Sequence, residues 1–167
     1  MVSPELPDEV PVVQMVLRSL ILGGLIISIL VVLLSVSMPI LYAGGCFLLG
    51  DNINMFLSNL CHKKPTKSIF LLGYPFGVCA RCFAIYFSYG AATLFFGFYR
   101  NLPNLLISLT MVIIMFFQVV LQSIIPAIDH NSVRFVAGVS FGIGFSASVF
   151  KAEEYIRNNN KLKEVRL

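Results

Sequence analysis

Long stretches of this 167-residue sequence contain no charged residue. The first reaches from Ser19 to Gly50, well beyond the roughly 20 apolar residues that a helix needs to cross about 30 Å of hydrocarbon. Three later stretches approach or exceed that length. The four stretches predict an all-α integral membrane protein, a bundle of four transmembrane helices with a loop containing Cys and His between the first two helices. The expected spans are about 19–43, 80–99, 103–126 and 132–150.

Composition supports a membrane protein and argues against other classes. Residues of the hydrophobic set make up 57% of the chain, charged residues make up 12%, and the mean hydropathy is +0.87, which leaves too little polar surface for a water-soluble globule. The net charge of +4 is spread over an apolar chain, so we expect neither disorder nor a nucleic-acid partner. A modest basic excess suits anionic headgroups, and the lipid bilayer is the expected partner.

The charge pattern divides the chain into three parts: an N-terminal arm at 1–18, the transmembrane domain at 19–150 and a basic C-terminal tail at 151–167. The first apolar run is too long for the core of a signal peptide, and acidic residues precede it. Four spans place both termini on one side, and the basic tail favours the cytoplasm for that side. We therefore expect a multi-pass protein of the cell membrane whose first and third loops meet on the extracytoplasmic face.

These two loops hold every cysteine and histidine of the chain. Cys79 and Cys82 form a CxxC pair, and Cys61 lies 18 positions before Cys79. Soft ligands at such spacing are typical of a tetrahedral zinc site, and iron is a second possibility. The fourth ligand stays open between His62, which is adjacent to Cys61, and His130 of the third loop. The candidate ligands are thus Cys61, His62, Cys79, Cys82 and His130.

Four charged residues are candidates for supporting the ligands or forming an ion pair. Asp129 can cap the fourth helix, pair with Arg134, or orient a ligand imidazole. Lys67 and Arg81 complete this group.

Farther along, Gly138, Gly142 and Ser146 recur at every fourth position, a spacing that lets two transmembrane helices approach closely.

The CxxC pair also permits a redox interpretation. A thiol at a helix N-terminus beside Arg81 has a lowered pKa and increased reactivity. Cys46 and Cys61 could then form a partner disulfide, although Cys46 is equally explained as a small buried residue. In outline, the arrangement resembles the four-helix membrane thiol oxidoreductases that pass electrons from a CxxC pair to a quinone.

Two sequence runs resemble a known family. They are Cys61 to Ser68 (Cys-His-Lys-Lys-Pro-Thr-Lys-Ser) and Cys79 to Tyr86 (Cys-Ala-Arg-Cys-Phe-Ala-Ile-Tyr). Both are similar to the motifs of the predicted membrane proteins grouped as domain of unknown function 2085. The chain departs from that pattern at Lys67, where arginine is usual, and at Phe83-Ala84, where Thr-Gly is usual. The resemblance extends to Asp129, Asn131, Arg134, Gly138 and Gly142, and it implies a membrane protein without implying an activity.

Three functions fit these observations. The first is a small polytopic membrane protein whose closed Cys/His metal site has a structural role, as an accessory or structural subunit beside other membrane subunits or a second copy. The second is a membrane thiol-disulfide oxidoreductase that uses Cys79 and Cys82. The third is a metal-assisted membrane enzyme with an open coordination position near His62, His130, Asp129 and Lys67. The sequence has no phosphate-binding glycine loop or nucleophile elbow, and it leaves open whether the protein is an enzyme.

Overall fold

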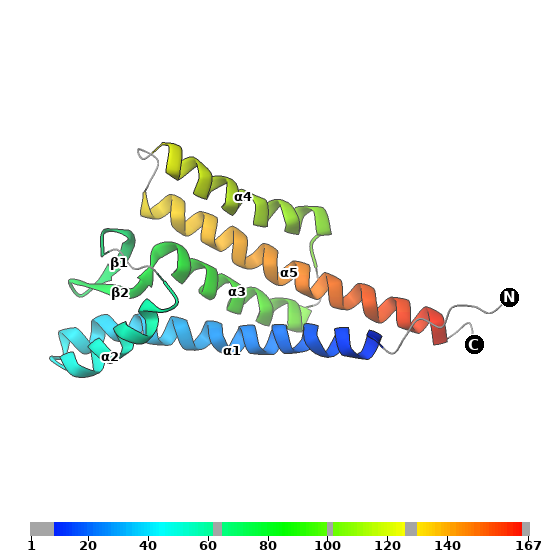
Figure 1. Ribbon diagram of the computed structural model, residues 1–167, viewed down its shortest axis with the longest axis horizontal. Coiled ribbons are helices and arrows are strands. Elements are labelled where there is room, and N and C mark those ends of the chain that lie inside the picture. The colour runs from blue at the N-terminus through cyan, green and yellow to red at the C-terminus, as the bar shows by residue number, and fades with distance from the viewer. Residues whose placement is uncertain (1–8, 62–64, 100–101, 126–129, 165–167) are drawn as a thin grey trace.

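The computed structural model describes residues 9–61, 65–99, 102–125 and 130–164, and these residues form a helical bundle with a small hairpin at one end (Figure 1). The elements in chain order are α1 (Glu9–Ala43), α2 (Phe47–Ser58), a 3-10 turn η1 (Pro65–Lys67), β1 (Ser68–Leu71), β2 (Tyr74–Cys79), α3 (Ala80–Tyr99), α4 (Leu105–Ile124) and α5 (Asn131–Glu164).

Four of these helices are long and apolar enough to cross a membrane. The candidate spans are Val13–Ala43 in α1, all of α3, all of α4, and Asn131–Asn159 in α5. This confirms the four-helix membrane fold. In Figure 1, α5 lies between α3 and α4, and α1 lies along the other side of α3.

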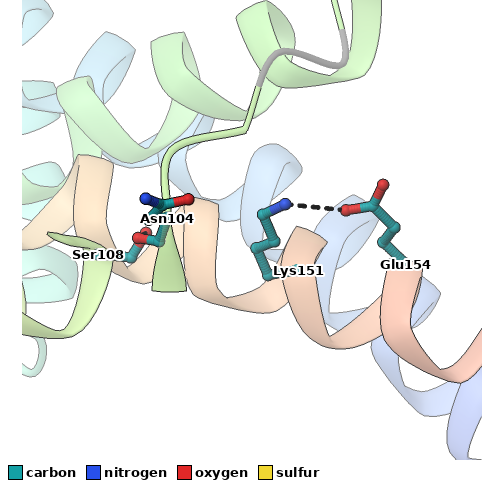
Figure 2. A network of polar contacts seen from close by, with 4 residues as sticks. All are labelled: Asn104, Ser108, Lys151 and Glu154. Carbon is teal, nitrogen blue, oxygen red and sulfur yellow. Dashed lines mark hydrogen bonds and ion pairs between the residues drawn. The ribbon is translucent and has the colours of Figure 1, made fainter. Parts of the chain in front are cut away.

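The N-terminal end of α1 and the C-terminal end of α5 lie at the same end of the bundle (Figure 1), and both helices continue beyond the expected spans. Helix α1 already begins at Glu9, inside the expected arm, and α5 continues to Glu164, through most of the expected tail. Charged pairs support these extensions: Arg18 and Glu153 join α1 to α5 at 3.5 Å, and Lys151 donates to Glu154 at 3.1 Å within α5. Figure 2 shows the second pair, together with Ser108 in the first turn of α4.

The segment between α1 and α3 also contains more regular structure than a loop. Helix α2 is only 12 residues long and includes Asp51 and two asparagines, so it lacks the long apolar run that marks a span. The strands β1 and β2 are antiparallel, with Leu71 opposite Tyr74. Their turn uses Leu72 at φ 53° and Gly73 at φ 84°, since two left-handed residues match the twist of a tight hairpin.

Small residues on α5 hold the bundle together. A Cβ atom at Gly138 would lie 2.6 Å from the Arg81 carbonyl oxygen, and one at Gly142 would lie 2.7 Å from the Ile85 carbonyl oxygen. One turn farther on, the Ser146 and Thr93 hydroxyl groups share a hydrogen bond of 3.0 Å. The predicted packing role of this stripe is confirmed, and its partner is α3.

Replacing Gly142 with alanine should destabilise the bundle by about 1–3 kcal/mol, the usual cost of overpacking a close contact. The added methyl group would meet the backbone of Ile85 and Tyr89. Gly23→Ala is the matched control, because a Cβ atom there has no described neighbour within 4 Å. Unfolding by SDS, followed by circular dichroism in detergent, measures both variants. Equal losses of stability would contradict the close contact between α3 and α5.

Candidate metal centre

Three cysteine thiols, those of the CxxC pair and of the more distant Cys61, meet at the hairpin end of the bundle. Cys61 lies just after α2, Cys79 ends β2, and Cys82 lies in the first turn of α3. Their sulfur atoms all lie within 4.8 Å of one another. Cys61 is buried, and the other two thiols are half-buried. We call these three residues the thiol cluster.

The strand β2 brings Cys79 to this place by packing very closely on α1 and α2. A Cβ atom at Gly77 would lie 3.2 Å from the Ser35 Cα atom of α1 and would collide with the Leu57 side chain of α2. The next residue, Val78, is fully buried with Leu57 and Val31 in one apolar core. Because this core lies beside the cluster and includes Cys61, apolar packing fixes the strand that carries Cys79.

Hydrogen bonds to sulfur favour the thiolate form at one member of the cluster. Hydrogen bonds from the Cys61 and Cys82 thiols, and then from backbone N–H groups of Cys82 and Arg81, lower the pKa of Cys79. The hydrogen bond between the Cys61 and Cys79 side chains raises the pKa of Cys61. The Cys61 sulfur also accepts a hydrogen bond from the Cys79 backbone N–H at 3.4 Å. Cys79 is therefore the thiol best prepared to bind a metal ion, because metals bind the deprotonated form.

The geometry fits a tetrahedral thiolate site. Zinc–sulfur bonds of about 2.3 Å at tetrahedral angles separate two ligand sulfurs by about 3.8 Å, and the cluster already lies within 4.8 Å. Small side-chain movements would close the remaining difference. Thiolate donors suit zinc and iron better than magnesium or calcium. Three protein sulfurs fill three of the four positions around such an ion.

The structure describes one of the two histidine candidates, His130. His130 is exposed and directly precedes the first residue of α5. Its carbonyl oxygen accepts a hydrogen bond from the Arg134 backbone N–H at 3.1 Å. Within the described ranges, the group that could hold a metal contains the three thiols and not His130. His62 and Asp129 lie outside the described residues, so their predicted roles stay predictions.

The three remaining charged candidates surround a cavity beside the cluster. This cavity has a volume of about 390 Å³. Lys67, Arg81 and Arg134 line it together with the three thiols, and α4 closes it with Val119, Gln122 and Ser123. The Arg81 guanidinium donates a hydrogen bond to the Gln122 side-chain oxygen, and Arg134 is 5% exposed.

One polar residue at this end, Gln122, was missed by the sequence analysis, and Asn131 of the family motif makes a contact that the sequence did not predict. Gln122 belongs to a charge-free run, and its polarity in that run was the available signal. Asn131 begins α5, and its amide donates to the Thr66 and Ser68 carbonyl oxygens at 3.5 Å each, which ties α5 to the hairpin. Cys46 is exposed before α2, so its interpretation as a small buried residue is wrong, and it does not belong to the thiol cluster.

The fold and this cluster define a small membrane protein with four spans and a candidate metal centre at one face. The sequence pattern of the predicted membrane protein family DUF2085 matches residues 61–148. The chain belongs to this family, and the matched region contains the thiol cluster and the helices α3, α4 and most of α5.

Two curated relatives are also similar to this region. An uncharacterized protein of Methanocaldococcus jannaschii is 31% identical over 90 residues, which is 51% of this chain and 58% of the relative. An uncharacterized protein of Methanothermobacter thermautotrophicus is 30% identical over 90 residues, which is 52% of this chain and 81% of the relative. No solved structure matches the chain.

Proposed function

We propose that this protein binds one transition metal ion through Cys61, Cys79 and Cys82, with zinc as the first candidate and iron as the second. The observation that carries the proposal is the meeting of three sulfurs from separate segments within 4.8 Å. Three of the four cysteines of the chain gather at this point. The fourth ligand is His62, His130 or a group from solution.

The metal has a structural role in this proposal. A two-stranded hairpin is only marginally stable by itself, and here it must stay on the heads of the helices. An ion bound to the end of α2, the end of β2 and the first turn of α3 joins these three elements at one point. Metal binding then contributes directly to the stability of this membrane face.

The same arrangement supports a role as an accessory or structural subunit of a membrane complex. Only 11% of the scored window of α4 is buried inside the bundle, so this helix offers a long apolar surface to lipid, to another membrane subunit or to a second copy. The metal centre would keep the end of α4 in place through the Arg81–Gln122 contact.

The distribution of cations supports an extracytoplasmic location of the metal centre in the cell membrane. Arg81 and Arg134 line the cavity, and so they are not free to act as cytoplasmic surface charges. At the opposite end, Arg18 is 64% exposed as a side chain, and the basic tail continues α5. The positive-inside rule therefore favours the cytoplasm for the ends of the chain.

A metal-assisted enzyme is the second candidate. The cavity of about 390 Å³ next to the cluster favours it, because an ion with three protein ligands can take water or substrate as the fourth. Lys67 lines this cavity, and His62, His130 and Asp129 are the further candidates around the open position.

Purified wild-type protein should contain about one zinc or iron ion per chain, and Cys79→Ser with Cys82→Ser should lose it, because one remaining thiol cannot hold the ion. Elemental analysis by mass spectrometry measures this. Cys46→Ser is the matched control and should keep the ion, since Cys46 lies outside the cluster. A metal-free wild type whose thiols become titratable only after reduction would contradict the proposal and favour the oxidoreductase.

Cys46 also reports the orientation of the protein. It is exposed near the hairpin end, so a membrane-impermeant maleimide added to intact spheroplasts should label it, and Cys46→Ser should abolish the signal. Mass spectrometry of the purified protein identifies the labelled residue. Labelling of Cys46 that requires lysis would place the metal centre on the cytoplasmic face instead.

A further inference from the structure

We propose that the cavity beside the thiol cluster is a binding site for a phosphate-bearing anion, either the headgroup of an anionic phospholipid or a soluble phosphate compound. The site lies where three helix ends meet: Arg81 is in the first turn of α3, Arg134 is in the first turn of α5, and Gln122 is in the last turn of α4. This inference goes beyond the metal site and does not depend on which ion the thiols bind.

Unused hydrogen-bond donors are the first argument. Within the described structure, the Arg81 Nε atom and the Gln122 Nε2 atom are buried and have no acceptor. Leaving a buried donor unsatisfied costs about 1–3 kcal/mol, and more when the group is charged. Both residues line the cavity. After a small rotation of the two side chains, the acceptor oxygens of a ligand in the cavity would reach both donors.

Charge is the second argument. Lys67, Arg81 and Arg134 bring three positive charges to the cavity, and its described lining contains no carboxylate. A zinc ion with three thiolates would contribute one negative charge. If Asp129 also pairs with Arg134, as the sequence predicts, one positive charge still remains. An anion is therefore the ligand that this cavity favours.

Geometry narrows the class of anion to phosphates. Guanidinium groups bind phosphate oxygens with paired donors, and lysine adds a point charge. The N-terminal ends of α3 and α5 both flank the cavity, and the positive end of a helix dipole favours an anion. A volume of about 390 Å³ has room for a phosphate group with its substituent. The cavity also lies at the ends of three spanning helices, which is the depth in the bilayer at which lipid phosphates lie.

A pair of glutamines on α4 provides the test. Gln122→Leu removes a donor from the cavity, and Gln118→Leu is the matched control, because Gln118 is buried one turn away on α4 without lining the cavity. One arm measures phosphatidylglycerol retained per chain by native mass spectrometry, with phosphatidylcholine as the reference lipid. The other arm measures radiolabelled inorganic phosphate by equilibrium dialysis in detergent. Metal content is measured for every variant.

We expect wild type and Gln118→Leu to bind the anion alike and Gln122→Leu to bind at least about tenfold more weakly, with the metal content unchanged. Arg81→Lys, which keeps the charge and removes the paired donors, should also weaken binding. Preference for phosphatidylglycerol identifies a lipid headgroup, and binding of inorganic phosphate identifies a soluble ligand. No binding in either arm, or equal losses in both glutamine variants, would overturn the inference. Metal-free protein that still binds the anion would count against the metal proposal alone.

Discussion

The contact between β2 and α1 determines where the chemistry of this protein lies. At Gly77 the strand lies so close to α1 and α2 that an added Cβ atom would be 3.2 Å from the Ser35 Cα atom and would force the Leu57 side chain to move, and Val78 then enters the apolar core. Without this contact, Cys79 would be carried by an isolated hairpin, and its distance from Cys61 would be unconstrained. Apolar packing thus places a polar centre at the face of the membrane.

The two arginines at that face must also be stabilised. Placing a charged arginine in a low-dielectric environment costs free energy unless hydrogen bonds or opposite charges compensate for the lost hydration. Here Arg81 bonds Gln122 of α4, and the cavity sets both Arg81 and Arg134 beside thiols that are anionic when they bind a metal. The negative thiolates and the positive arginines therefore stabilise each other. The Arg81 and Gln122 donors that have no acceptor are the basis of the proposed anion site.

The sequence predicted the parts of the structure that depend on length and spacing. Charge-free runs longer than a bilayer located the four spans, and the CxxC pair with Cys61 located residues that the fold gathers. Prediction failed where tertiary contacts decide the outcome. Helix α2 and the hairpin carry short, mixed patterns that become ordered by packing on α1. Gln122 reaches the cavity because α4 packs along α5, and sequence spacing does not encode this contact. His130 is exposed outside the thiol cluster, and its role as the fourth ligand stays a prediction.

In the proposed metal centre, three cysteines of separate segments share one metal ion. X-ray absorption at the zinc or iron edge of the purified protein tests this directly, because it reports the kind and number of ligand atoms. We expect three sulfur ligands at about 2.3 Å and one nitrogen or oxygen ligand. A shell of nitrogen and oxygen atoms alone would show that the bound ion does not use the thiol cluster, and the proposed metal centre would then be wrong.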